Sequence, residues 1–342
     1  MKQPKPKILI ACHRHLYSPH RGGGETSMAI IAEYLQGEGF DVACWVNPHT
    51  TGKSRSGILF LGGALENLIA GADAVLSWGS TAFQAYTYCR RFGKPFILSV
   101  RWWRNVIDVS GMIGDLSSRS RERWHDTRQP MFDYAAAVIT NNNYSAGIIE
   151  RFYNRKALVS YVPIPGQATR AGKANGAIVA ISPNKGIGER RALLDIEAHL
   201  PQGEKMIIVN AQQRQYHRTK IEVVPYMQNL NDIWRRAKVF IQPIYGNDIC
   251  GTLRTTIEAQ QHGVPVIANA RCGLDEKVPA GNLVPYSAST REWVEKIREV
   301  SQDWQARSEE ALDVFQQYDT PAQLGIFKRE IEKALKVKNT AL

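Results

Sequence analysis

The sequence contains few cysteines, and they form no pattern. Five occur among 342 residues, and no two stand in a C-x-x-C spacing. An odd and scattered set argues against a disulfide framework and against a zinc site with cysteine ligands. We therefore expect reduced thiols and no bound metal ion. The five positions are Cys12, Cys44, Cys89, Cys250 and Cys272.

The sequence also lacks a long apolar run. A membrane-spanning helix needs about 18 or more consecutive apolar residues, and no such stretch is present. The first residues, MKQPKPK, lead straight into a short apolar segment, which is not the pattern of a signal peptide. We therefore expect a cytoplasmic protein, with peripheral attachment to the inner face of the membrane as the alternative.

Acidic residues are scarce relative to basic ones, and the net charge is +11. Residues 1–165 hold 19 basic against 12 acidic residues, and the remainder holds 24 against 20. A positive field of this size favours an anionic partner, whether a membrane phospholipid, a nucleic acid or a charged substrate. The charge alone does not choose among the three.

Short apolar segments alternate with helical ones along the chain. This rhythm predicts an α/β fold with two doubly wound, Rossmann-like domains. The polar, glycine-rich stretch GQATRAGKANG is expected to be a linker with few contacts. The predicted boundaries are 1–165 and 166–320 for the domains and 321–342 for a last helix. Strands are expected at residues 7–11, 41–46, 58–61, 74–78, 95–100, 135–140, 177–181, 206–209, 239–241 and 264–268.

Residues 237–269 contain the pattern of a strand, a polar loop, a helix and a second buried strand. In open parallel sheets, ligands bind beyond the carboxyl ends of the strands, where helix N-termini attract anions. The loop before the helix is therefore a candidate phosphate site, with Thr252 as the expected N-cap. The candidate contacts in this loop are Asp248, Gly251, Thr252 and Leu253.

Arg254 and Glu258 are four residues apart on the predicted helix, so they share one face. They form either a solvated ion pair, which is common at this spacing, or part of a ligand site.

A second glycine-rich loop, Gly22-Gly23-Gly24, precedes a helix expected from Thr26 to Leu35. Three glycines let the backbone approach a ligand closely. The spacing matches neither the dinucleotide motif nor a P-loop. A plain turn is therefore the alternative.

Arginines and tryptophans are concentrated between Arg101 and Arg128. Such a surface suits stacked bases and phosphates, or anionic lipid headgroups. The alternative is a solvated face with tryptophans at a core edge. The residues are Trp102, Trp103, Arg104, Arg119, Arg121, Arg123 and Trp124.

The segment IEAQQHGVPVIA resembles the donor-site signature of retaining glycosyltransferases of the GT-B fold, group 1 or family 4-like. The resemblance implies that Glu258 binds the ribose hydroxyls of a nucleotide-sugar. Cys250 stands where the family has another glutamate, and Asp248 is the nearest acid that can replace it. Lys185, followed by Gly186, resembles the lysine that neutralises the donor diphosphate. Arg101 stands where relatives place a histidine, so it is carried over as a donor-phosphate or acceptor contact.

Pro19 with Gly22-Gly23-Gly24 resembles the first loop of the same family, which faces donor diphosphate and acceptor. The resemblance implies two domains that face each other across a cleft, the first on the acceptor side and the second binding the nucleotide-sugar. It also implies a last helix that crosses back to the first domain.

The implied activity is metal-independent transfer of a hexosyl or pentosyl group from a nucleotide-diphosphate sugar, with retention and without a cofactor. Lys185, Arg254, Glu258 and Arg101 are the expected catalytic residues. The expected acceptor is a cell-envelope lipid or glycan, and modified, hydroxymethylated bases of DNA are the alternative. Two other classes stay open: a catalytically silent sugar- or nucleic-acid-binding protein, and an isomerase acting on a nucleotide-sugar.

Overall fold

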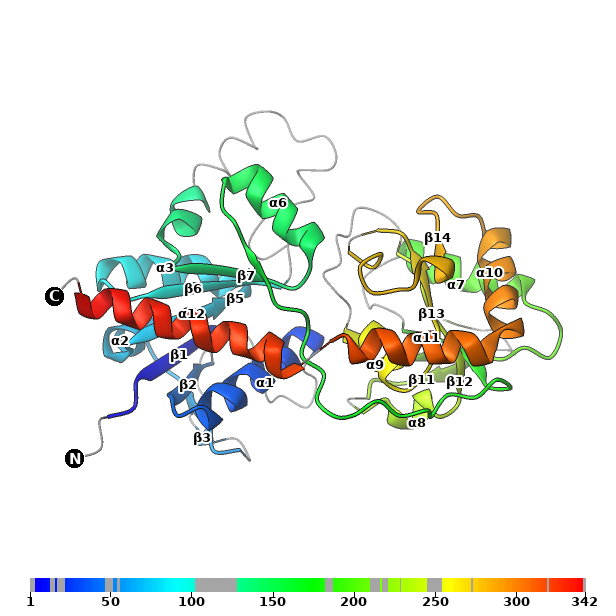
Figure 1. Ribbon diagram of the computed structural model, residues 1–342, viewed down its shortest axis with the longest axis horizontal. Helices are drawn as coiled ribbons and strands as arrows, with labels where there is room; N and C mark the ends of the chain where they lie inside the picture. The colour runs from blue at the N-terminus through cyan, green and yellow to red at the C-terminus, as the bar shows by residue number, and fades with distance from the viewer. Residues whose placement is uncertain are drawn as a thin grey trace. The chain divides into compact units, whose positions relative to one another are not determined.

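The chain divides into two compact units in a computed structural model (Figure 1). One comprises Met1–Pro163 with Thr320–Leu342, and the other comprises Ile164–Asp319. The structure describes residues 4–12, 16, 22–46, 52–53, 56–101, 128–181, 187–209, 216, 221–227, 229–244, 254–271, 273–318 and 320–340.

Within the described residues, the first unit contains an eight-stranded sheet of order β3-β4-β2-β1-β5-β6-β7-β8. Neighbouring strands are parallel except β3 and β4. The strand order reverses between β1 and β5, which makes their carboxyl ends the switch point of this sheet. The strands are β1 (Lys7–Cys12), β2 (Asp41–Trp45), β3 (Gly52–Lys53), β4 (Leu59–Leu61), β5 (Ala74–Trp78), β6 (Phe96–Val100), β7 (Ala137–Thr140) and β8 (Leu158–Val159).

Helices α1 and α12 pack on the same face of the first sheet (Figure 1). Met28 of α1 and Phe327 of α12 join Ile10, Ile97 and Ile139 of the strands in one buried cluster. The C-terminal helix is therefore part of the first unit's core. The helices of this unit are α1 (Gly23–Gly37), α2 (Leu65–Gly71), α3 (Ala82–Arg91), α6 (Asn143–Tyr153) and α12 (Thr320–Thr340), with a short helical turn at Gly79–Thr81 and helical residues 128–134.

In the described part of the second unit, six parallel strands have the order β11-β10-β9-β12-β13-β14. Here the order reverses between β9 and β12. The strands are β9 (Ala177–Ile181), β10 (Met206–Val209), β11 (Ile221–Val224), β12 (Ala237–Gln242), β13 (Val266–Asn269) and β14 (Leu283–Val284). The helices are α7 (Ile187–His199), α8 (Asn231–Trp234), α9 (Arg254–Gln261), α10 (Thr290–Gln302) and α11 (Trp304–Gln316), with a short turn at Ala280–Asn282.

Both faces of the second sheet are buried. Val239 and Ile241 of β12 pack with Trp293 on one face, whereas Phe240 packs with Trp234 on the other. A parallel strand covered on both sides needs a continuous apolar run, which VFI within β12 and AIVAI in β9 supply. The prediction of an α/β fold with doubly wound parallel sheets is confirmed.

Helix α1 begins at Gly23, three residues earlier than expected. Gly22 is its N-cap, and Oε2 of Glu25 accepts a hydrogen bond from the Gly22 N–H at 3.0 Å. This capping contact stabilises the first turn in spite of the low helix propensity of glycine. In α6, by contrast, a side chain caps the helix, because Asn142 Oδ1 accepts a hydrogen bond from the Ser145 N–H at 2.7 Å.

The stretch expected to be a linker, residues 166–176, is not free of contacts. The N–H of Thr169 donates to Gln261 O at 2.7 Å, and that of Lys173 donates to Ala237 O at 2.8 Å. Gln261 Nε2 donates to Pro165 O at 3.0 Å. The prediction was wrong because a glycine-rich, polar composition also suits an extended segment that lies close against another backbone.

Three cysteines fall within the described residues, and all are buried: Cys12, Cys44 and Cys89. Burial raises the pKa of the Cys89 thiol to about 12. In the described part of the chain, no helix is both long and apolar enough to cross a membrane, and no cluster of three histidine, cysteine or acidic side chains could hold a metal ion.

Candidate functional site

The first candidate site lies at the carboxyl ends of β9 and β12, the switch point of the second sheet. These strands are adjacent and parallel, with Ala180 opposite Ile241. The chain leaves β9 into residues 182–186 and leaves β12 toward residues 245–253, so both predicted loops start at one sheet edge. The expected contacts Lys185, Asp248, Gly251, Thr252 and Leu253, together with Cys250, lie outside the described residues.

Helix α9 follows the second of these loops and carries the Arg254–Glu258 pair. Arg254 Nε donates to Glu258 Oε1 at 2.6 Å. The side chains are only 14% and 21% exposed. No other hydrogen bond involves the Glu258 carboxylate among the residues that the structure describes, so Oε2 can accept from a ligand.

Another ion pair of the same type shows that this burial is unusual. Arg291 and Glu295 on α10 are also four residues apart and lie 2.7 Å from each other, but their side chains are 87% and 52% exposed. That pair is the solvated kind, worth little to stability. The Arg254–Glu258 pair is instead recessed, so the purely solvated alternative does not describe it.

Asn269, at the end of β13, fixes the backbone of Ile244, which follows β12, and the sequence analysis missed it. Its Oδ1 accepts a hydrogen bond from the Ile244 N–H at 2.6 Å, and its Nδ2 donates to Pro285 O at 3.3 Å. The side chain is fully buried. The sequence signal that could have identified Asn269 is a polar residue directly after an apolar strand.

The glycines of the first unit lie at the other switch point. Gly24 packs on Trp78 at the end of β5, so tightly that a Cβ atom at Gly24 would lie 2.6 Å from Trp78 Cζ2. The Gly22 N–H is already bonded to Glu25. Gly24 is therefore required for close packing of α1 on the sheet, which is a structural role beside the expected phosphate contact of Gly22, Gly23 and Gly24.

We expect Gly24→Ala to lower the free energy of unfolding by about 1–3 kcal/mol, because the rigid indole must move to admit a methyl group. Chemical denaturation measures the change. Gly37→Ala at the other end of α1 is the matched control, since nothing lies within 4 Å of its Cβ position, and it should stabilise by up to about 1 kcal/mol. Equal effects of the two changes would contradict the steric argument.

Arg101 follows β6, and its side chain is buried, with 6% of the residue exposed. Its guanidinium lies over the Phe327 ring, 5.3 Å from the centroid, and Nη2 donates to Ser160 O at 3.5 Å. Burial lowers the pKa of Arg101 to about 10. Sequence reasoning placed Arg101 at the start of an arginine and tryptophan surface, and the structure places its side chain beneath α12.

Arg128, at the other end of that surface, stacks on Phe83 of α3 at 5.0 Å from the ring centroid. Burial lowers the pKa of Arg128. Phe83 is 39% exposed. The other members of the surface, Trp102, Trp103, Arg104, Arg119, Arg121, Arg123 and Trp124, lie outside the described residues.

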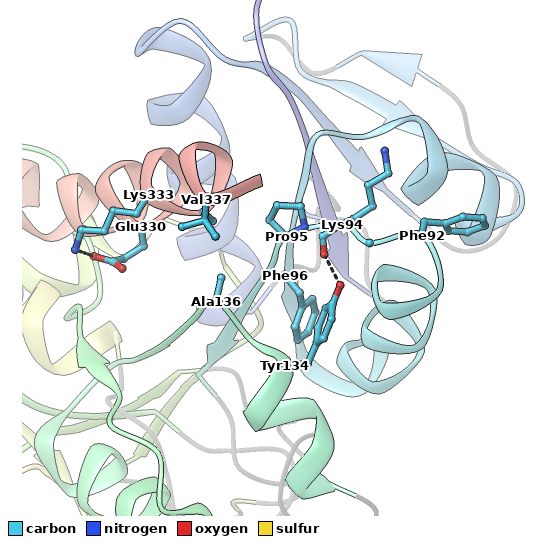
Figure 2. Close-up of a pocket in the computed structure, with 11 residues that line it drawn as sticks. Phe92, Lys94, Pro95, Phe96, Tyr134, Ala136, Glu330, Lys333 and Val337 are labelled. Carbon is cyan, nitrogen blue, oxygen red and sulfur yellow. Dashed lines mark hydrogen bonds and ion pairs between the residues drawn. The ribbon is translucent and has the colours of Figure 1, made fainter. Parts of the chain in front are cut away.

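A cavity of about 650 Å³ lies at the opposite end of the first sheet, before β6 and β7. Pro95, Phe96 and Ala136 line it together with Val337 of α12 (Figure 2). On its rim, Lys333 and Glu330 are paired at 2.7 Å. None of the expected site residues lines this cavity, so it is separate from the candidate site.

Residues 199–303 match the family model described as Glycosyl transferases group 1. The matched segment includes α9 with Arg254 and Glu258. The predicted resemblance to group 1 glycosyltransferases is thereby confirmed over this segment. No curated protein matches the chain.

Solved glycosyltransferase structures share the fold over nearly the whole chain. Sucrose-phosphate synthase from Thermosynechococcus elongatus has a TM-score of 0.75 at 14% identity, covering 96% of this chain and 100% of that one. Anabaena HepE in complex with UDP-glucose has a TM-score of 0.70 at 14% identity, covering 98% and 100%. The lipopolysaccharide outer core galactosyltransferase WaaB has 0.64 at 12% identity, covering 96% and 99%. At identities this low, the structural similarity establishes the fold alone. It confirms the predicted GT-B fold class.

Proposed function

We propose that this protein is a retaining, metal-independent glycosyltransferase that takes a hexosyl or pentosyl group from a nucleotide-diphosphate sugar. The observation that carries the proposal is the recessed Arg254–Glu258 pair at the start of α9. It follows the carboxyl end of β12 at a switch point, where open parallel sheets bind ligands. It also lies within the segment that matches the group 1 family.

Glu258 is the proposed ribose contact. A carboxylate that uses only Oε1 for Arg254 has Oε2 available for sugar hydroxyls. The hydrogen bond from Arg254 fixes the orientation of this carboxylate. The complex of HepE with UDP-glucose supports a nucleotide-diphosphate sugar as the donor class.

Charge that develops on the departing diphosphate is the main target for catalysis. We assign its stabilisation to Lys185, to Arg254 and to the helix N-terminus near Thr252, with Asp248, Gly251 and Leu253 completing the donor loop. On the acceptor side, Gly22, Gly23 and Gly24 contribute backbone N–H groups other than the one that Glu25 uses. This division makes 166–320 the donor domain and 1–165 the acceptor domain.

For the acceptor we propose an anionic cell-envelope lipid or glycan, which places the enzyme in the cytoplasm at the inner face of the membrane. Arg128 stacked on Phe83 supports an amphipathic, basic surface on the first unit. The structural likeness to WaaB is consistent with an envelope acceptor. Modified bases of DNA are the second candidate, because stacked arginines and aromatics also suit nucleic acid.

A thermal-shift screen of nucleotide-sugars, followed by assay of released nucleotide, tests the donor assignment. We expect one donor to stabilise the protein, by about 2.7 kcal/mol at 100 times its dissociation constant, and slow nucleotide diphosphate release without acceptor. Stabilisation without release would favour the silent binding protein. Conversion of the donor without any acceptor into another nucleotide-sugar would favour an isomerase, and no stabilisation by any donor would contradict the proposal.

Binding to anionic vesicles and to duplex DNA across a salt series tests the acceptor class in the same preparation. The comparison variant changes Arg119, Arg121 and Arg123 together to alanine. We expect vesicle binding that this variant weakens, since each basic residue near an anionic surface contributes about 1 kcal/mol. Steeply salt-dependent DNA binding without vesicle binding would reverse the order of the two acceptors.

A further inference from the structure

The apolar face of α12 continues beyond the residues that the first sheet buries. Leu324, Phe327, Ile331 and Ala334 follow one another at helical spacing, and each is at most 7% exposed. Val337, three residues after Ala334, lies at the edge of the same face and is 67% exposed. An exposed valine by itself is ordinary. This one, however, extends a buried face and lines the cavity at the amino end of the sheet.

The cavity has an apolar wall to which three segments contribute (Figure 2). Val337 and Ala334 come from α12, Pro95 and Phe96 from the start of β6, and Ala136 from the residue before β7. The volume of about 650 Å³ lies within the range of about 300–1,000 Å³ that small-molecule sites have. The wall is recessed, because Ala334 is 6% and Phe96 0% exposed. A single hydrocarbon chain can enter such a hollow, whereas the flat surface of a bilayer cannot.

The charged side chains around this wall are basic in balance. Lys94 and Lys333 line the cavity, against one acid, Glu330. Lys94 Nζ is engaged by a backbone carbonyl at 2.7 Å. Lys333 is the exposed cation of the rim, since its side chain is 68% exposed and its Nζ donates to Glu330 Oε1 at 2.7 Å. Lys336, also exposed, adds a further positive charge one turn later. The rim therefore favours an anionic group.

We propose that this cavity binds a free fatty-acid anion, with its hydrocarbon chain against Val337, Pro95 and Ala136 and its carboxylate at the rim beside Lys333. Each methylene that enters the cavity favours binding, because apolar surface is removed from water. The carboxylate stays in solvent, where burial costs it nothing and the lysine supplies a counter-charge.

This ligand is distinct from the donor and the acceptor of the proposed reaction. Pro95 and Ala136 precede β6 and β7, so the cavity lies at the amino ends of these strands. The candidate ligand sites lie instead beyond carboxyl ends, where open parallel sheets bind substrates. The fatty-acid site therefore does not rest on the proposed function, and direct binding measurements test it without any assay of transfer.

Isothermal titration of the full chain with dodecanoate, below the concentration at which micelles form, tests the site. We expect the wild type to bind dodecanoate, and to bind decanoate about 10- to 20-fold more weakly because two fewer methylenes are buried. Ala136→Trp places an indole in the cavity and should lower dodecanoate affinity at least about tenfold, since it displaces part of the chain. Its matched control is Ala198→Trp, at an exposed alanine of α7 in the second unit.

Two variants of α12 distinguish the wall from the rim. Val337→Asp alters a largely exposed position, so the fold is retained, and it should also lower dodecanoate affinity at least about tenfold by placing a charge against the chain. Lys333→Glu should lower the affinity about two- to fivefold, as expected for an exposed ion pair. Arg329→Glu makes the same charge change on the same helix away from the cavity lining, and should stay within about twofold of the wild type.

Absence of dodecanoate binding, or equal affinities for decanoate and dodecanoate, would overturn the proposal. An affinity that either Ala136→Trp or Val337→Asp leaves unchanged would do the same, because the chain would then lie elsewhere. Equal effects of Lys333→Glu and Arg329→Glu would count against the placement of the carboxylate. A last arm offers vesicles of phosphatidylglycerol and phosphatidylcholine. Vesicle binding that Val337→Asp abolishes, without binding of dodecanoate, would assign this surface to the bilayer and reject the fatty-acid site.

Discussion

Replacing Glu258 by alanine is expected to weaken binding of the nucleotide-sugar donor about 10- to 150-fold while the fold is retained. A hydrogen bond to a charged group contributes about 1.5–3 kcal/mol, and 1.4 kcal/mol corresponds to a tenfold change in affinity. The variant loses the carboxylate whose Oε2 is available to a ligand. Isothermal titration with the donor that stabilises the wild type gives the affinity, and circular dichroism verifies the fold.

The matched control is Glu295→Ala. Glu295 makes the same kind of ion pair with Arg291, but it belongs to α10 and its side chain is 52% exposed. Its loss should leave donor affinity within about twofold, in keeping with the small contribution of solvated pairs. If Glu258→Ala kept wild-type affinity for every donor, or if the control lost as much, the ribose assignment would fail.

The sheets were predictable because each strand is a run of apolar residues. Such a run can be identified in the sequence without knowing which distant segments pack against it. AIVAI at β9 and VIA within β13 are examples, since a strand buried on both faces needs an unbroken apolar run. The cap at Asn142 was predictable for a similar reason, because its hydrogen bond reaches only three residues along the chain.

The environment of Arg101 was not predictable from local sequence. Its ring contact comes from Phe327 on α12, and α12 is fixed beside Ser160 by a hydrogen bond from Ser160 Oγ to Gln323 O at 3.0 Å. These partners lie far along the chain. A polar residue after a strand therefore looked exposed, although the fold buries it.

The candidate donor site was predictable in part. Spacing placed Arg254 and Glu258 on one helical face, and the hydrogen bond between them bears this out. Spacing did not distinguish a recessed pair from a solvated one, because Arg291 and Glu295 have the same separation and opposite exposure. Burial depends on neighbouring elements, which sequence periodicity does not report.

Lys185→Ala is expected to lower kcat about 100- to 1000-fold while changing donor affinity far less. Negative charge on the diphosphate increases as the bond to the sugar breaks, so a lysine beside it stabilises the transition state more than the ground state. Removing one donor to a developing charge costs about 2.7–4 kcal/mol in the barrier. Lys185 is assigned to the site from the topology of the sheet, because residues 182–186 follow β9, the neighbour of β12.

Single-turnover rates and donor titrations on the same preparations separate the two effects, with Lys173→Ala as the control. Lys173 is an exposed lysine of the same unit, so its loss changes the net charge equally. Lys185→Arg should recover part of the rate, because it restores the charge with a different geometry. Equal losses in rate and affinity would mean that Lys185 makes the same contact in ground and transition states, and no loss in either would remove it from the site.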